Sequence, residues 1–147
     1  RDRVLAFLRI FDLDQDKHAP ISSYSKGMRQ KVLISAALLH DPDILLLDEP
    51  LSGLDVTTAL VIRDLIRRLA AERKVIIYSS HVLEVTEKIC TKVIILHKGS
   101  IVANDSVENL RHLMHLPSLA DIFSELVLHE DTDAVACRLV EAMKGTA

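Results

Sequence analysis

The sequence ILLLDEPLSGLD, residues 44–55, decides the fold class of this chain. Four apolar residues lead directly into two adjacent carboxylates, Asp48 and Glu49, and a turn containing Pro, Ser and Gly follows. An apolar run of this length, bounded by turn residues, is typical of a strand that is buried on both faces in a parallel sheet. Because open α/β folds bind their ligands at the carboxyl ends of such strands, we expect a binding site around these carboxylates.

Helix and strand patterns alternate on both sides of this stretch. Before it, Ser25 stands at the N-cap position of a helix of about fourteen residues that ends before Pro42. After it, residues 56–72 carry apolar side chains on one helical face, and residues 75–78 form a second buried strand that leads into His81. We therefore predict an α/β fold with a mostly parallel sheet and flanking helices.

Shorter elements complete the predicted fold. In chain order they are a helix at 1–10, a loop at 12–23, a helix at 82–90, a hairpin of strands 93–96 and 100–103 around Lys98-Gly99, and helices at 105–115, 119–126 and 133–144, the last ending near Gly145. The hairpin is expected to form an antiparallel edge of the parallel sheet.

The composition indicates one soluble domain with a sizeable core. Of 147 residues, 49% are hydrophobic and 27% are charged, and the net charge of -3 is mixed along the chain, which argues against direct nucleic-acid binding. Cys90 and Cys137 are isolated, so we predict two reduced cysteines and neither a zinc site nor a disulfide. His112, His115 and His129 have no metal-ligand spacing. The chain begins at Arg1 within a helical pattern, so we expect it to be part of a longer protein.

Three polar groups are expected to meet at one end of the sheet: Asp48 with Glu49, residues 52–55, and His81. Asp48 suits a hydrated Mg²⁺, while Glu49 can orient and deprotonate a water molecule. His81 can contact a terminal phosphate and that water together. The helix start after Ser25 can receive a phosphate through its free N–H groups, although an ordinary capped helix is the alternative.

The run YSKGMRQKVLISAALLHDPDILLLDEPLSGLD, followed later by SSH, resembles the carboxyl-terminal half of an ATP-binding cassette (ABC) ATPase domain. Tyr24 to Met28 is similar to the signature motif, 44–49 to the Walker B strand with its catalytic glutamate, 52–55 to the D-loop, and His81 to the switch histidine. The resemblance extends from about residue 1 to Leu126. The DIFSEL sequence at its end is similar to the close of the domain in exporter ATPases.

This resemblance implies the P-loop NTPase fold, truncated at its amino end, with ATP and Mg²⁺ as ligands. The implied roles are catalytic for Glu49 and His81, Mg²⁺ binding for Asp48, and ATP binding for Ser25, Lys26, Gly27, Met28 and Asp55. Lys26 replaces the first glycine of the usual LSGGQ signature, and Met28 stands where Gln is common. We interpret these changes as a functional subclass variant in which Lys26 adds a positive contact to the phosphates.

The resemblance also divides the chain into residues 1–23 (end of the helical subdomain), 24–116 (carboxyl-terminal half of the ATPase core) and 117–147 (helical extension). The sequence contains no GxxxxGK followed by Ser or Thr, and no Q-loop glutamine can be assigned. We therefore expect this chain alone to bind ATP poorly and not to hydrolyse it. We also expect its exposed sheet edge to cause self-association.

The implied function is an ATPase subunit of an ABC transporter, of the exporter type, that drives transport through ATP-dependent dimerisation. Its implied partners are a second ABC ATPase subunit and a membrane-spanning permease, and its implied location is the cytoplasmic face of the membrane. Two alternatives remain at this point. One is a soluble ABC ATPase that acts in translation or chromosome maintenance, and the other is a structural fragment without activity.

Overall fold

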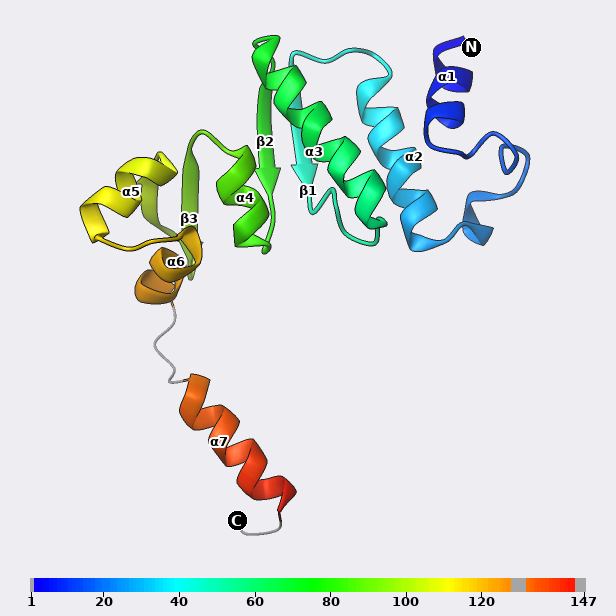
Figure 1. Ribbon diagram of the computed structural model, residues 1–147. Coiled ribbons are helices and arrows are strands. Elements are labelled where there is room, and N and C mark those ends of the chain that lie inside the picture. Colours follow the sequence, from blue (N-terminus) through cyan, green and yellow to red (C-terminus); the bar gives the residue numbers. More distant parts are fainter. Residues whose placement is uncertain (1, 128–131, 145–147) are drawn as a thin grey trace. The chain divides into compact units, whose positions relative to one another are not determined.

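The computed structural model describes residues 2–127 and 132–144, and the chain divides into two compact units, Arg1–Val82 and Leu83–Ala147. Figure 1 shows the order of the elements along the chain. His129 and Gly145, which the sequence predictions mention, lie outside the described residues. The predicted domain boundaries after residues 23 and 116 are functional divisions and remain predictions.

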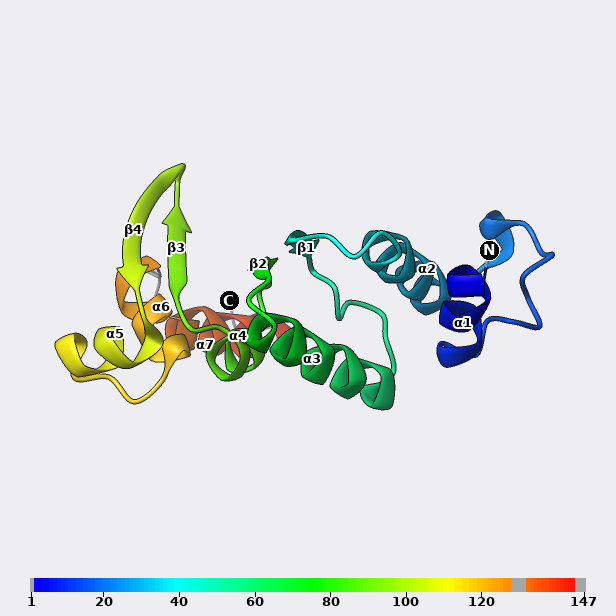
Figure 2. The ribbon, with the colours of Figure 1, turned by 90° about the horizontal axis from the view of Figure 1, so that it is seen from above.

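The first unit contains the two strands and the long helices that flank them. Its elements are α1 (Asp2–Ile10), the 3-10 turn η1 (Ile21–Ser23), α2 (Lys26–Leu38), β1 (Ile44–Asp48), α3 (Val56–Ala71) and β2 (Val75–Ser79). All predicted helices and strands of this unit are confirmed, and η1 is an additional turn within the predicted loop. Figure 2 views β1 and β2 almost end-on, with α3 along one side of the pair.

The strands β1 and β2 are parallel, with Ile44 opposite Val75 and Asp48 opposite Ser79. Leu45 is buried on the face that α3 covers, together with Ile62 and Ile66 of that helix. The opposite face is exposed in the described part of the chain: its side chains are Ile44 (58% exposed), Leu46 (71%), Val75 (54%) and Ile77 (57%). The prediction that β1 is buried on both faces is therefore wrong, because alternate side chains of a strand point to opposite faces and α3 covers only one.

The second unit contains α4 (Leu83–Ile89), β3 (Val93–His97), β4 (Ser100–Asp105), α5 (Val107–Met114), α6 (Leu119–Val127) and α7 (Thr132–Met143). Lys98 (φ 48°) and Gly99 (φ 79°) form the predicted turn between β3 and β4, and positive φ at both positions suits a tight hairpin. β3 and β4 form a two-stranded sheet of their own. This differs from the expectation that the hairpin is an edge of the parallel sheet, since among the described residues neither β3 nor β4 pairs with β1 or β2.

The core of the second unit lies between the hairpin and two helices. It consists of Val93 and Ile95 from β3, Val107 and Leu110 from α5, and Leu119 and Ile122 from α6. Cys90 packs against this core, and its burial raises the pKa of the thiol. Glu87 joins three elements, because its carboxylate pairs with Arg111 at 3.3 Å and accepts a hydrogen bond from the backbone N–H of Leu119 at 3.1 Å. Among the described residues, no helix is long and apolar enough to cross a membrane.

Candidate functional site

The parallel register brings the polar residues after β1 and β2 to the same end of the sheet. Asp48 lies opposite Ser79, and the Ser79 hydroxyl donates a short hydrogen bond to Asp48 Oδ1. Asp48 is exposed, so its carboxylate is held in place by a neighbour while remaining open to a ligand. Sequence reasoning assigned no role to Ser79. No pattern in the sequence could have found it, because the partnership of Asp48 and Ser79 depends on the register of β1 against β2.

The backbone turns away from the direction of β1 at Glu49, and the Glu49 side chain faces the segment after β2. Its backbone is in the left-handed region, with φ 44°, and its N–H donates to the Ser79 carbonyl at 3.0 Å. Such a conformation is uncommon for a non-glycine residue. Here the hydrogen bond to β2 continues the ladder for one more residue, and the turn directs the Glu49 side chain toward His81.

The predicted catalytic residues Glu49 and His81 are in contact. Glu49 Oε1 lies 2.6 Å from His81 Nδ1 and accepts a hydrogen bond from the His81 backbone N–H at 2.8 Å. Glu49 Oε2 accepts a longer bond, 3.4 Å, from the Ser80 hydroxyl. The hydrogen bond from the His81 side chain is the main reason that the pKa of Glu49 is lowered. Glu49 is therefore a charged acceptor at neutral pH, and His81, whose side chain is 79% exposed, presents the rest of its ring to solvent.

The turn after Glu49 contains two backbone hydrogen bonds and ends at a helix cap. The N–H of Ser52 donates to the Glu49 carbonyl at 3.0 Å, and the N–H of Leu54 donates to the Leu51 carbonyl at 3.3 Å. Asp55 is the N-cap of α3: its Oδ1 accepts from the Thr58 N–H at 2.8 Å, and its Oδ2 from the Thr58 hydroxyl at 2.6 Å. The bond from the Thr58 hydroxyl is the first cause of the lowered pKa of Asp55.

The start of α2 has the predicted capped geometry. Ser25 is its N-cap, and the Ser25 hydroxyl accepts a hydrogen bond from the N–H of Met28 at 3.2 Å. The N–H groups of Lys26 and Gly27 belong to the first turn of α2, where N–H groups have no acceptor within the helix. They therefore lie at the positive end of the helix dipole. This end can receive a phosphate oxygen, and the ATP-binding role of Ser25 to Met28 stays a prediction.

Contacts between α2 and the 50–55 turn were not predicted from the sequence. Lys26 Nζ donates to the Ser52 hydroxyl at 2.8 Å, and Gln30 Nε2 donates to the Pro50 carbonyl at 3.2 Å. Lys26 and Gln30 are four residues apart and therefore lie on the same side of the helix. The sequence spacing therefore predicts that the two side chains lie together, but it does not predict which segment they contact.

The arrangement fits Mg²⁺ held jointly with a nucleotide. Mg²⁺ commonly takes one or two carboxylates and completes its shell with water and phosphate oxygens, so the predicted role of Asp48 does not require further protein ligands. The described residues contain no cluster of three or more His, Cys, Asp or Glu side chains that would hold a metal by themselves. This edge thus presents two carboxylates and an imidazole, and the roles of Asp48 at a metal and of Glu49 and His81 at a water molecule stay predictions.

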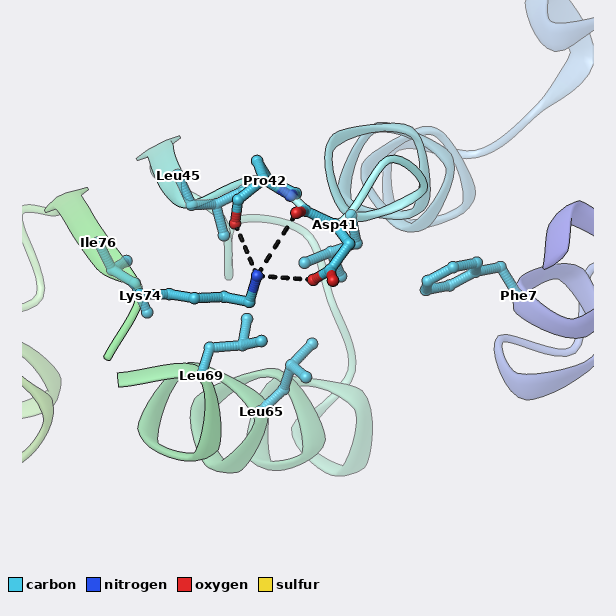
Figure 3. Close-up of a pocket in the computed structure, with 9 residues that line it drawn as sticks. Phe7, Asp41, Pro42, Leu45, Leu65, Leu69, Lys74 and Ile76 are labelled. Atoms are coloured by element: carbon cyan, nitrogen blue, oxygen red, sulfur yellow. Dashed lines mark hydrogen bonds and ion pairs between the residues drawn. The ribbon is translucent and has the colours of Figure 1, made fainter. Parts of the chain in front are cut away.

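A separate cavity of about 200 Å³ lies at the other end of the strands, as Figure 3 shows. Its lining residues are Phe7, Leu38, Asp41, Pro42, Leu45, Leu65, Leu69, Lys74 and Ile76. Lys74 Nζ pairs with Asp41 Oδ1 at 2.6 Å and donates to the Pro42 carbonyl at 3.0 Å. The hydrogen bond between the Lys74 and Asp41 side chains lowers the pKa of Asp41 and raises that of Lys74. Because these polar groups bind one another, this cavity offers an apolar lining and no evident nucleotide contact.

Comparisons with known proteins find similar chains among ABC transporter ATP-binding proteins. Residues 1–52 match the ABC transporter family model. The ABC transporter ATP-binding protein NatA of Bacillus subtilis is 44% identical over 108 residues, which cover 73% of this chain and 44% of NatA. A fluoroquinolones export ATP-binding protein of Mycobacterium tuberculosis is 36% identical over 107 residues, covering 73% of this chain and 36% of that protein.

A further relative and a solved structure are also ATP-binding proteins of transporters. The bacitracin transport ATP-binding protein BcrA of Enterococcus faecalis is 36% identical over 104 residues, covering 70% of this chain and 34% of BcrA. A solved structure of an ATP-binding subunit of an ABC transporter superposes with a TM-score of 0.79 at 31% identity, covering 85% of this chain and 53% of that one. The chain thus spans less than half the length of these three curated relatives.

Proposed function

Because this chain belongs to the ABC transporter family and corresponds to the carboxyl-terminal part of its ATPase domain, we propose that the intact protein is the ATP-hydrolysing subunit of an exporter. The observation that carries this proposal is the 2.6 Å contact between Glu49 and His81 beside Asp48. The export and transport functions in the names of two relatives favour an exporter over a soluble ATPase of translation or chromosomes.

In the proposed reaction, water attacks the terminal phosphate of ATP and ADP leaves. Asp48 would hold Mg²⁺, which when bound neutralises charge on the phosphate oxygens. Glu49 would orient the attacking water and accept its proton, and His81 would contact the terminal phosphate through its exposed ring edge.

The proposed active form is a dimer of two such subunits on the cytoplasmic face of the membrane, docked on a permease. In that form the start of α2, with Ser25, Gly27 and Met28, would face the phosphates of ATP held by the other subunit. The helix start supports the assignment, because the N-terminal end of a helix stabilises an anion. Asp55, at the start of α3, would lie near the same subunit boundary.

The proposal is tested by Glu49→Gln in the intact protein. We expect MgATP binding to be retained, ATP hydrolysis to fall by roughly a hundredfold or more, and the ATP-bound dimer to accumulate in size-exclusion chromatography with light scattering. Glu108→Gln, an exposed substitution of the same kind on α5, is the matched control and should hydrolyse ATP normally. Hydrolysis at the wild-type rate by Glu49→Gln would overturn the proposal.

We further propose that the 147 residues alone do not hydrolyse ATP. The sequence lacks the glycine-rich loop and the lysine that cradle the β- and γ-phosphates in P-loop enzymes. Titration of the isolated chain with MgATP, followed by calorimetry, should detect no tight binding. A dissociation constant in the micromolar range would contradict this expectation.

A further inference from the structure

The side chain of Lys26 lies across the turn that follows Glu49. Its Nζ donates to the Ser52 hydroxyl at 2.8 Å. Its methylene stem covers Gly53, since a Cβ placed on Gly53 would come within 2.9 Å of both Lys26 Cγ and Cδ. The apolar stem and the charged end of one side chain thus both contact the same turn, as is common for long basic side chains.

Two more polar side chains of α2 reach the same turn. Gln30 Nε2 donates to the Pro50 carbonyl at 3.2 Å, and Lys31 Nζ lies 3.9 Å from Asp55 Oδ2. Lys26, Gln30 and Lys31 therefore contact the turn at residues 52, 50 and 55. Side chains of α2 thus join this helix to the segment from Pro50 to Asp55. A phosphate is proposed to bind at the first turn of the same helix.

We propose that Lys26 is a positioning residue that fastens the start of α2 to the 50–55 turn, so that a phosphate bound at Ser25 to Gly27 also sets the position of the turn after Glu49. This inference rests on the proposed function and adds a route by which the two parts of the site act together. It also differs from the expectation that Lys26 contacts a phosphate directly. A glycine at position 26, the usual residue of the signature motif, could not form the bond to Ser52.

The test measures the turn directly, in the intact protein and without nucleotide. Amide hydrogen exchange of Ser52 and Leu54, read by NMR, reports the opening of the turn, because these N–H groups donate to Glu49 and Leu51. Lys26→Met keeps an apolar stem and removes the donor. We expect it to raise both exchange rates about threefold, with Ser52→Ala having a similar effect and the double variant no larger one.

Two controls complete the experiment. Lys17→Met, an exposed substitution of the same kind in the loop before α2, should leave both exchange rates unchanged. Lys26→Arg keeps a donor and should restore slow exchange. Unchanged exchange in Lys26→Met would overturn the inference, and weaker MgATP affinity with unchanged exchange would instead assign Lys26 to direct phosphate contact. Neither result depends on hydrolysis, so each is distinct from a failure of the Glu49→Gln test.

Discussion

Gly27 lies so close to Gly53 that a Cβ on Gly27 would stand 2.6 Å from the Gly53 carbonyl oxygen. The contact is between the first turn of α2 and the turn after Glu49, and its nearest atom belongs to the backbone. A flexible side chain could move aside, but a backbone carbonyl in a tight turn cannot do so cheaply. Gly27 is thus required by the packing of the chain itself, in addition to any approach of a phosphate.

Gly27→Ala should therefore destabilise the protein, although alanine is the better helix former. The propensity gain is at most about 1 kcal/mol, while a methyl forced this close to a backbone atom costs about 2–3 kcal/mol, the upper part of the usual range for an overpacked contact. We expect a net loss of about 1–2 kcal/mol in the free energy of unfolding, measured by urea denaturation of the intact protein. Gly99→Ala is the comparison, because its φ of 79° adds strain but no heavy atom lies within 4 Å of the new Cβ. A Gly27→Ala variant as stable as wild type would refute the packing argument.

Ile62→Ala should be among the more damaging substitutions in the first unit. Ile62 is 1% exposed on the face of α3 that covers the sheet. Removing three of its carbons leaves a cavity and loses burial, which together cost about 2–5 kcal/mol. The adjacent Val61→Ala, at a position that is 50% exposed, is the matched control and should change stability by less than about 0.5 kcal/mol. Equal losses in the two variants, measured by thermal and urea unfolding, would show that α3 does not pack as described.

The stabilising contribution of Glu49 should depend on pH in the acid range. Its pKa in the folded protein is lowered from the ordinary value of 4.5, chiefly by the hydrogen bond from His81. The contribution is therefore complete above pH 4.5 and is lost as the pH falls through the folded pKa. The difference in unfolding free energy between wild type and Glu49→Gln should shrink from about pH 6 to about pH 3. A difference for Glu49→Gln that stays constant over this range would contradict the assigned contact.

The exposed face of the parallel sheet should make the isolated 147 residues self-associate. Ile44 pairs with Val75 and Leu46 with Ile77, so the four exposed side chains form one contiguous apolar patch. Sedimentation equilibrium should give a mean mass that rises with concentration. The pair Leu46→Thr and Ile77→Thr, which retains good strand formers, should lower that mass. Leu113→Gln, which removes an exposed leucine from α5, should not lower it. A monomer at every concentration would disprove the expectation.

Local patterns in the sequence were sufficient for most of the elements and for the composition of the site. The apolar run before Asp48, the cap at Ser25 and the turn at Lys98-Gly99 each depend on residues within a few positions of one another. The meeting of Glu49 and His81 also followed from sequence, because parallel strands end at the same edge of a sheet. The burial of β1 on both faces did not, because burial depends on what covers each face, and apolar residues alone do not say whether a cover is present.

By itself, the sequence determined the strand and helix order, the capped start of α2, and the identity of the carboxylates and the histidine at the sheet edge. These features follow from local backbone preferences and from the period of the apolar side chains. Only the tertiary structure decided that Ser79 holds Asp48, that Lys26 reaches Ser52, and that Gly27 and Gly53 are in contact. Each of these joins segments at least 26 residues apart, and such contacts are set by the packing of α2 and β2 around the turn after β1, which no local pattern encodes.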